Sequence, residues 1–278
     1  MSDDPIGYWN DEAGPKWVRA HDVLDPLLTP ITDHLFDAIE IHSGARVIDV
    51  GCGSGSTTLE WARRVGPKGR VWGVDVSKPL IEHARTRCAD VDQIEIHHGD
   101  AATFPFEPGW ADLVTSRFGV MFFTHPPTAF KNLRHALGTK GRLAFVCWQS
   151  IQRNPWNTFI MQAFPEVAGA APSPEDAPGP FSLCSSERIA RLLDEAGFSQ
   201  VSIEDFSTKL GLGETVDHAL AGLTEVGPLA RLLTEADKDE HPKLLERARV
   251  FLQEQYRAGP PALDAAVWLV QAEAPGST

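Results

Sequence analysis

The stretch from Arg46 to Thr58, RVIDVGCGSGSTT, constrains the fold of this chain more than any other. A short apolar run comes first, three glycines follow within five residues, and a helical pattern begins at about Ser56. A strand, a glycine turn and a helix in this order form a nucleotide-type pocket at the carboxyl end of a parallel strand. The remaining elements can be placed relative to this turn.

Strand and helix patterns alternate on both sides of the turn. The helices between the strands are expected near 56–65, 78–89 and 127–137, and this alternation predicts a parallel sheet wound on both faces. The expected strands are 45–50, 70–75, 94–98, 111–116 and 141–148, followed later by 201–207 and 264–274. The 278 residues therefore suggest one α/β domain with a cap.

Five segments are expected within this one compact domain. Residues 1–43 have a loosely helical apolar spacing and should form a cap over the sheet or the pocket mouth. The other segments are the Rossmann-like core (44–150), a proline-rich loop with a return to the sheet (151–210), a helical insertion or lid (211–260), and the last strand and tail (261–278). The loop is a candidate to close over a ligand.

Composition excludes several classes of partner. The formal net charge of -13 argues against nucleic acid, because phosphate binding relies on Lys and Arg, and it provides no attraction to anionic lipid. No run approaches the ~20 apolar residues that span a bilayer, so we expect no membrane partner. The four cysteines form no CxxC pair and predict free thiols without a metal site. With an acidic N-terminus that lacks a targeting pattern, the sequence predicts a cytoplasmic protein.

The spacing of the glycines narrows the range of candidate ligands. Gly51, Gly53 and Gly55 read G-x-G-x-G, whereas a dinucleotide site needs G-x-G-x-x-G. Asp75 ends the second strand, where a carboxylate can accept hydrogen bonds from both hydroxyls of a ribose. Asp100 ends the third strand and could accept from an adenine amino group. No Lys or Arg lies at the turn for phosphates, so a phosphate-free adenosine fits best, and S-adenosylmethionine is the common cofactor of that kind.

The sequence resembles class I S-adenosylmethionine-dependent methyltransferases, of the broad group that is similar to the ubiquinone and menaquinone C-methyltransferases. The motifs that carry the resemblance are VIDVGCGSG, WGVDVS, HHGDAATFPF, ADLVTSRFGVMFF and LRHALGTKGRLAFVCW, over roughly residues 44–150. The resemblance implies a doubly wound, mostly parallel seven-stranded sheet whose last strand is antiparallel. In the family the sixth and seventh strands form a near-hairpin, but here about 50 residues separate them.

The resemblance also implies roles for individual residues. Asp75, with Val76 beside it, would hold the ribose, while Asp100 and Ala101 would read the adenine. Ser116 and Arg117 would lie near the methionine part, and an aromatic residue of the cap, Tyr8 or Trp17, would meet the cofactor. The residues implied to shape the cofactor turn are Asp49, Gly51, Gly53 and Gly55.

The expected reaction is in-line transfer of a methyl group to a small-molecule acceptor, at O, N or C. His21 with Asp22, and His125, are the candidates for a general base. The Trp and Phe content favours an apolar or aromatic acceptor, and a homodimer stays open. Two alternatives remain: a nicotinamide-dependent oxidoreductase, which the glycine spacing disfavours, and a non-catalytic S-adenosylmethionine-binding protein.

Overall fold

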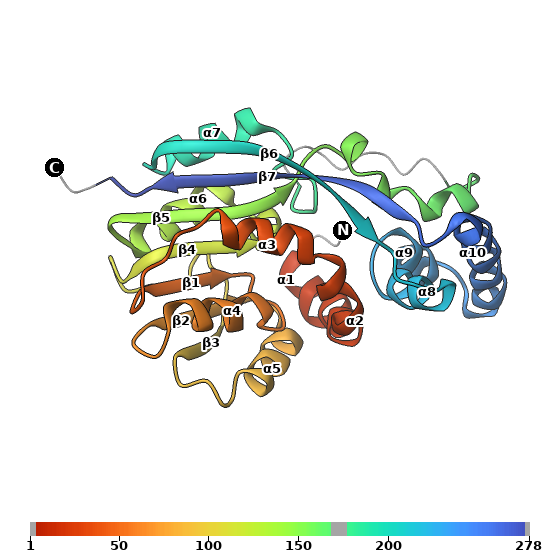
Figure 1. Cartoon of the computed structure of the whole chain (residues 1–278), viewed down its shortest axis with the longest axis horizontal. Coiled ribbons are helices and arrows are strands. Elements are labelled where there is room, and N and C mark those ends of the chain that lie inside the picture. The colour runs from red at the N-terminus through yellow and green to blue at the C-terminus, as the bar shows by residue number, and fades with distance from the viewer. Residues whose placement is uncertain (1–3, 168–176, 276–278) are drawn as a thin grey trace.

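The computed structural model describes residues 4–167 and 177–275, so the middle of the expected proline-rich loop lies outside the described residues. Within them the strands form one sheet in the order β3-β2-β1-β4-β5-β7-β6 (Figure 1). The strands are β1 (Arg46–Val50), β2 (Arg70–Asp75), β3 (Ile94–His98), β4 (Ala111–Arg117), β5 (Leu137–Trp148), β6 (Ser199–Gly211) and β7 (Ala262–Glu273). Strands β1 to β5 pair in parallel, and β7 runs antiparallel to both β5 and β6. The predicted fold class is confirmed.

Helices cover both faces of this sheet. Figure 1 shows α3 and α4 in front of the strands and α6 and α7 behind them. The α-helices are α1 (Pro5–Tyr8), α2 (Gly14–Leu27), α3 (Thr29–Asp37), α4 (Ser56–Val65), α5 (Lys78–Arg87), α6 (Pro126–Ala136), α7 (Ser186–Glu195), α8 (Val216–Glu225), α9 (Pro228–Glu235) and α10 (His241–Gln255). A π-helical turn, η1 (Trp9–Ala13), joins α1 to α2. The 3-10 turns are η2 (Gly119–Phe122), η3 (Ile151–Arg153), η4 (Pro155–Asn157), η5 (Ile160–Ala163), η6 (Lys238–Glu240) and η7 (Tyr256–Ala258).

The central strands are apolar on both faces because both faces are covered. In β1, Val47, Ile48 and Val50 are all buried, and the one polar side chain among them, Asp49, is buried as well. Residues 139–141 lie inside β5 as a bulge. Ala111 pairs with Leu137 and Leu113 pairs with Arg142, so the strand begins four residues earlier than the 141–148 that the sequence predicted.

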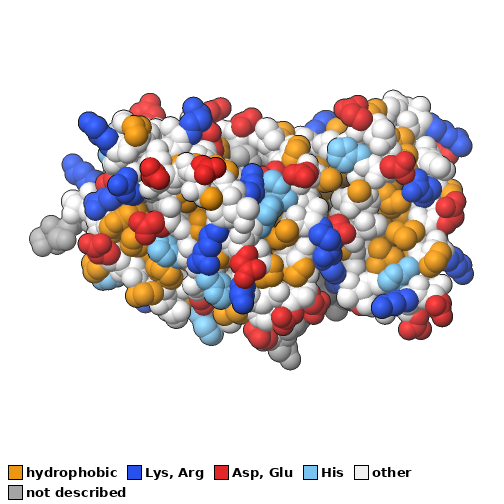
Figure 2. Space-filling model, turned by 90° about the horizontal axis from the view of Figure 1, so that it is seen from below, with side chains coloured by type: hydrophobic (Ala, Val, Ile, Leu, Met, Phe, Trp, Pro, Cys, Tyr) orange, Lys and Arg blue, Asp and Glu red, His pale blue; other side chains and the backbone are white. Residues whose placement is uncertain are grey.

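The insertion between β6 and β7 has a core of its own. Phe159, Ile160 and Phe164, which follow β5, are buried against Leu229 and Leu252 of the inserted helices. The beginning of the region expected to be a proline-rich loop is therefore part of a packed unit. Figure 2 shows acidic and basic side chains interspersed over one face of the molecule, with apolar side chains gathered at the end that the insertion forms.

The N-terminal segment lies between the sheet and the insertion (Figure 1). On one side, α2 packs against α5. On the other side it packs against α8, where Arg19 forms an ion pair with Glu225 at 2.7 Å. Because α2 has neighbours on both sides, its position depends on the core and on the insertion together.

Candidate cofactor and acceptor pocket

The glycine turn after β1 folds as the sequence predicts. Gly51, Gly53 and Gly55 all have positive φ angles, of 67°, 53° and 82°, which L-residues with side chains rarely adopt. A Cβ on Gly51 would lie 2.6 Å from Cα of Gly119, so the turn and the segment after β4 touch backbone to backbone. A Cβ on Gly53 would meet no protein atom within 4 Å, which leaves the backbone there open to a ligand.

The carboxylate of Asp75 is held by two backbone N–H groups. Gly53 N donates to Oδ2 at 2.9 Å, and Ser77 N donates to Oδ1 at 2.8 Å. Burial raises the pKa of this carboxyl above its usual value, although both N–H groups and His98 oppose the shift. Each oxygen still has a lone pair for a further donor, so the carboxylate is oriented before any ligand binds.

Asp49 lies beneath the turn and is almost completely buried. Its Oδ2 accepts from the hydroxyls of Thr57 and Thr58 at 2.7 Å each, whereas its Oδ1 has no partner among the described residues. Burial raises the pKa of Asp49 to about 6, against the opposing effect of the two threonine hydroxyls. The residue ties the end of β1 to the first turn of α4.

Asp100 follows β3 and lines the pocket together with Ala101. Its Oδ1 accepts from Ala102 N at 2.8 Å and so stabilises the turn that follows. Val76, next to Asp75, also lines the pocket, and its carbonyl accepts from Asn10 Nδ2 of the cap at 3.0 Å. The loops after β2 and β3 thus face the same space as the glycine turn.

A polar cluster joins the cap to the core, and we call it the cap–turn cluster (His21, Asp25, Ser56 and Arg117). Arg117 Nη2 donates to Asp25 Oδ1 at 2.7 Å, and Ser56 Oγ donates to the other oxygen of the same carboxylate. Nε2 of His21 lies 3.1 Å from both Asp25 Oδ2 and Ser56 Oγ. Burial raises the pKa of Asp25, but Arg117 and Ser56 outweigh it and hold the pKa below its usual value.

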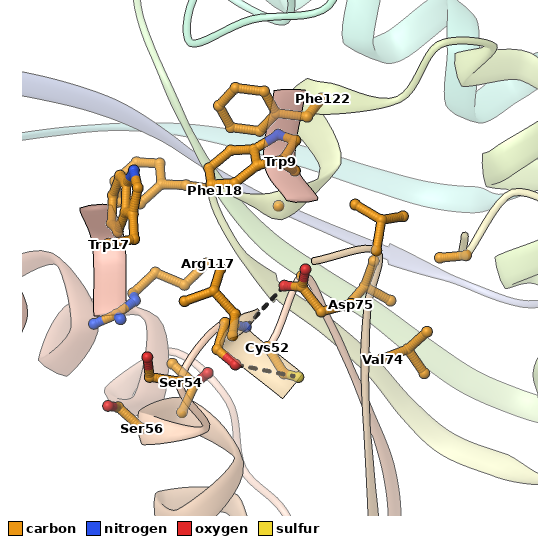
Figure 3. Close-up of a pocket in the computed structure, with 18 of the residues that line it drawn as sticks. Trp9, Trp17, Cys52, Ser54, Ser56, Val74, Asp75, Arg117, Phe118 and Phe122 are labelled. Carbon is orange, nitrogen blue, oxygen red and sulfur yellow. Dashed lines mark hydrogen bonds between the residues drawn. The ribbon is translucent and has the colours of Figure 1, made fainter. Parts of the chain in front are cut away.

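Opposite Asp75 and the polar groups of the turn, the pocket has an aromatic wall (Trp9, Trp17, Phe118 and Phe122). Figure 3 shows these four rings on one side, with Asp75, Ser54 and Ser56 on the other. Trp9 meets Phe122 edge to face at 5.0 Å between ring centroids, and Trp17 lies 6.1 Å from Trp9. Phe118 stacks on Trp148 at 4.3 Å.

The cavity that these groups enclose has a volume of about 1190 Å³ when its open mouth is included. The sequence-predicted residues that line it are Trp17, His21, Gly51, Gly53, Asp75, Val76, Asp100, Ala101 and Arg117.

Other predicted residues lie beside or beneath the cavity. Ser116 is buried, with its hydroxyl donating to Val50 O at 2.7 Å and accepting from Gly119 N, so it braces the turn from below. Asp49 lies under the turn, and Gly55 belongs to the turn but does not line the cavity, since a Cβ there would lie 3.1 Å from Cys88 Sγ and 3.3 Å from Ala84 Cβ. Tyr8 is half-buried outside the pocket lining, and Trp9 beside it lines the pocket instead. His125 is exposed at the start of α6 and is not a lining residue.

The sequence did not indicate several of the lining residues, and Gly119, Asp25 and Trp9 show why. Gly119 lies within the motif ADLVTSRFGVMFF, but its need to be glycine comes from tertiary contacts, because a Cβ there would lie 2.6 Å from Val50 O and 2.7 Å from Gly51 Cα. Asp25 looks like an ordinary polar position of an amphipathic helix. Trp9 was counted only as aromatic content, because its direction depends on the π-helical turn that begins with it.

Metal-binding clusters and membrane-spanning helices were sought in residues 4–167 and 177–275, and neither is found there. In these ranges no group of three or more His, Cys, Asp or Glu side chains is arranged to hold a metal ion. None of the helices in them combines the length and the apolar character that crossing a bilayer requires.

Comparison with known proteins shows similarity to methyltransferases. Residues 47–141 match a family model described as a methyltransferase domain. The chain is 28% identical over 180 residues to demethylmenaquinone methyltransferase of Staphylococcus saprophyticus. The aligned region covers 61% of this chain and 76% of the relative.

Solved structures show the same fold. The YcgJ protein of Bacillus subtilis has a TM-score of 0.56 at 16% identity, covering 88% of this chain and 98% of its own. A phosphoethanolamine N-methyltransferase of Haemonchus contortus, solved with S-adenosyl-L-methionine, has a TM-score of 0.53 at 16% identity, covering 88% of this chain and 52% of its own.

Proposed function

We propose, from the premise that this chain carries a class I S-adenosylmethionine-dependent methyltransferase domain, that it binds S-adenosylmethionine in the glycine-turn pocket and methylates a small-molecule acceptor. The observation that carries the proposal is the pair formed by Gly53 and Asp75. Gly53 leaves open backbone toward the cavity, and its N–H orients the Asp75 carboxylate at 2.9 Å. A ribose diol beside a carboxylate of this kind is the contact expected for an adenosine.

The charges around the turn favour a cationic ligand over a pyrophosphate. Asp75 and Asp100 line the cavity beside the turn, and the nearby guanidinium groups are already engaged. Arg87 donates to Ser54 O at 2.6 Å and to Ser56 Oγ at 2.8 Å, and Arg117 is paired with Asp25. A dinucleotide phosphate here would meet carboxylates without a free cation, whereas the ammonium and sulfonium groups of S-adenosylmethionine would be stabilised.

In this proposal Asp75 and Val76 hold the ribose, Asp100 and Ala101 contact the adenine, and Arg117 and Trp17 lie toward the methionine end. When bound, S-adenosylmethionine supplies an electrophilic methyl group: the acceptor's lone pair forms the new bond to carbon, the carbon–sulfur pair stays on sulfur in S-adenosylhomocysteine, and the acceptor's proton passes to solvent. The chain contributes alignment and exclusion of water, which can lower the barrier by ~7–11 kcal/mol in favourable cases.

Of the two candidate bases, only His21 lines the cavity, whereas His125 does not. Both of its ring nitrogens have partners, with Asp22 3.1 Å from Nδ1 and Ser56 3.1 Å from Nε2. We therefore assign His21 to holding the cap in place, and we expect the acceptor to ionise without a base from the protein.

Calorimetry with S-adenosylhomocysteine and with NAD tests the cofactor. We expect S-adenosylhomocysteine to bind and NAD to give no heat; the reverse result would reject the proposal. Transfer of a labelled methyl group into products of a metabolite extract then tests catalysis, with Asp75→Ala as the background control. Tight binding without any labelled product would instead support a non-catalytic binding protein.

A further inference from the structure

Resting on the proposed function, we infer that the carboxylate of Asp25 is a built-in competitor of the cofactor, because it occupies Arg117, the cation that the carboxylate of S-adenosylmethionine needs. The two residues come from different parts of the fold: Asp25 belongs to α2 of the cap, and Arg117 ends β4. Figure 3 shows the Arg117 guanidinium on the side of the cavity where Trp17 and Ser56 lie. S-adenosylmethionine carries a carboxylate beside its ammonium and sulfonium groups, and only this carboxylate requires a cation.

Arg117 is the only Lys or Arg among the described residues that line the cavity. The exposed fraction of its side chain is 15%, so water can replace a lost partner only in part. The neighbouring Arg87 is not a lining residue, and it donates to Ser54 O at 2.6 Å and to Ser56 Oγ at 2.8 Å. Because a charge that is removed from water needs a partner, a carboxylate bound in this cavity depends on Arg117.

Arg117 already holds a carboxylate of the chain itself. Its Nη2 donates to Asp25 Oδ1 at 2.7 Å, and its Nη1 donates to the hydroxyl of Thr32 in α3 at 2.8 Å. Both terminal nitrogens are therefore bound to the cap, one of them in a charge-assisted hydrogen bond. A second carboxylate at the same guanidinium would lie beside the charge of Asp25, and like charges in a partly desolvated site repel each other. One of the two carboxylates has to give way.

Asp25 is the group that can withdraw. Arg117 is fixed at the end of β4, an interior strand of the sheet. The side chain of Asp25 has an exposed fraction of 24%, and its Oδ2 has partners of its own, the hydroxyl of Ser56 and Nε2 of His21 at 3.1 Å. After losing Arg117 this carboxylate would still have hydrogen-bond partners and access to water, so its withdrawal costs less than that of a fully buried charge.

The exchange couples the pocket to the cap. Without the cofactor, Asp25 neutralises Arg117 and holds α2 against the sheet. With the cofactor bound, the cofactor's carboxylate takes this place, and when S-adenosylhomocysteine leaves, Asp25 returns, so that the guanidinium always has an anionic partner. Since each carboxylate replaces the other, the cofactor's carboxylate adds little net affinity in the wild-type protein.

Two ligands that differ in this carboxylate test the inference by calorimetry: S-adenosylhomocysteine and its decarboxylated analogue, which keeps the adenosine, the thioether and the amine. The readout is the Kd of the analogue divided by the Kd of S-adenosylhomocysteine on the same protein, a ratio that a loss of stability alone does not change. We expect a ratio below threefold for wild type. For Asp25→Ala we expect at least tenfold, through tighter binding of S-adenosylhomocysteine.

Asp25→Asn, which keeps the size of the side chain but not its charge, should change the ratio in the same direction and serves if the alanine variant does not fold. Asp33→Ala removes an exposed carboxylate from α3 of the same cap and is the matched control, with the wild-type ratio expected. Adding Arg117→Leu to Asp25→Ala should return the ratio to below threefold.

A tenfold ratio already in wild type, or an unchanged ratio in the Asp25 variants, would overturn the inference. Equal weakening of both ligands by Asp25→Ala would also overturn it, because Asp25 would then bind the amine that the two ligands share. Failure of the wild-type protein to bind either ligand would instead contradict the proposed function.

Discussion

The guanidinium of Arg117 and the carboxylate of Asp25 meet at 2.7 Å across 92 positions of sequence. Arg117 ends β4 and Asp25 belongs to α2, so this ion pair joins the sheet to the cap inside the pocket lining. The exposed fractions of the two side chains are 15% and 24%, so solvent screens the pair only in part. The pair makes the position of the cap sensitive to the charge of one carboxyl group.

Replacing Arg117 with Leu leaves Asp25 without its cation, and we expect a loss of about 1–3 kcal/mol in the free energy of unfolding at pH 7. The folded-state pKa of Asp25 lies below its unfolded value of ~3.9, so the stabilisation is present above about pH 4 and is lost as the pH falls below it. Denaturant unfolding at pH 7 and pH 3 measures both effects. The difference between wild type and variant should shrink at pH 3; a constant difference would contradict the role of this charge.

Asp75→Ala should weaken S-adenosylhomocysteine binding by about 1–3 kcal/mol, the usual cost of losing a charged hydrogen-bond partner. Asp75→Asn should be damaging too, because its amide can offer only one acceptor oxygen to the two N–H groups of Gly53 and Ser77. Calorimetry measures both, with the exposed Asp92→Ala as control. Full affinity in a folded Asp75→Ala variant would argue against a ribose contact.

Asp49 is expected to make stability fall as the pH rises. Its folded-state pKa of about 6 lies above the unfolded value of ~3.9, so the folded state holds an extra proton between these values. The extra proton on Asp49 contributes fully to the free energy of unfolding below about pH 4. This contribution, of up to about 3 kcal/mol, is lost as the pH rises through about 6. Asp49→Asn removes the titration.

Unfolding free energies of wild type and Asp49→Asn at pH 4.5 and pH 7.5 provide the measurement. Between pH 4.5 and pH 7.5 the unfolding free energy of wild type should fall by more than that of the variant. The other titrating groups contribute equally to both proteins. Parallel pH profiles would mean that Asp49 does not titrate in this range.

At Phe118 we expect glycine to be tolerated better than alanine, the reverse of the usual order. Both substitutions remove the ring that stacks on Trp148, but only glycine relieves the left-handed backbone, a difference of about 1–2 kcal/mol. Thermal or denaturant unfolding of Phe118→Gly and Phe118→Ala measures it. If the alanine variant is the more stable, Phe118 is not strained in solution.

The contact between α2 and α8 lies outside the pocket but should affect the affinity for S-adenosylhomocysteine. A Cβ at Gly222 would lie 3.0 Å from Val23 Cγ1, so Gly222→Leu forces the two helices apart and should weaken S-adenosylhomocysteine binding severalfold. Glu225→Ala removes only the exposed ion pair with Arg19, worth about 0–1 kcal/mol, and serves as the matched control. Equal affinity in both variants would show that the insertion does not position the cap.

Local patterns predicted the core of this fold well, because they report on local structure. The apolar runs of β1, β2 and β4 lie within one residue of their expected bounds, since strands covered on both faces need continuous apolar side chains. The start of β5 was wrong by four residues, because the bulge at Lys140 is set by pairing with β4. Boundaries that depend on a neighbouring strand cannot be read from one segment.

The sequence by itself determined the glycine turn and the carboxylates after β2 and β3. Each follows from a short motif, because positive φ angles favour glycine and parallel strands bring their carboxyl ends to one edge. The tertiary structure alone decided that Trp9 rather than Tyr8 lines the cavity, that Gly119 must touch Gly51, and that Asp25 binds Arg117. These relationships join segments far apart in the chain, and only the packing of the cap against the sheet and the insertion brings them together.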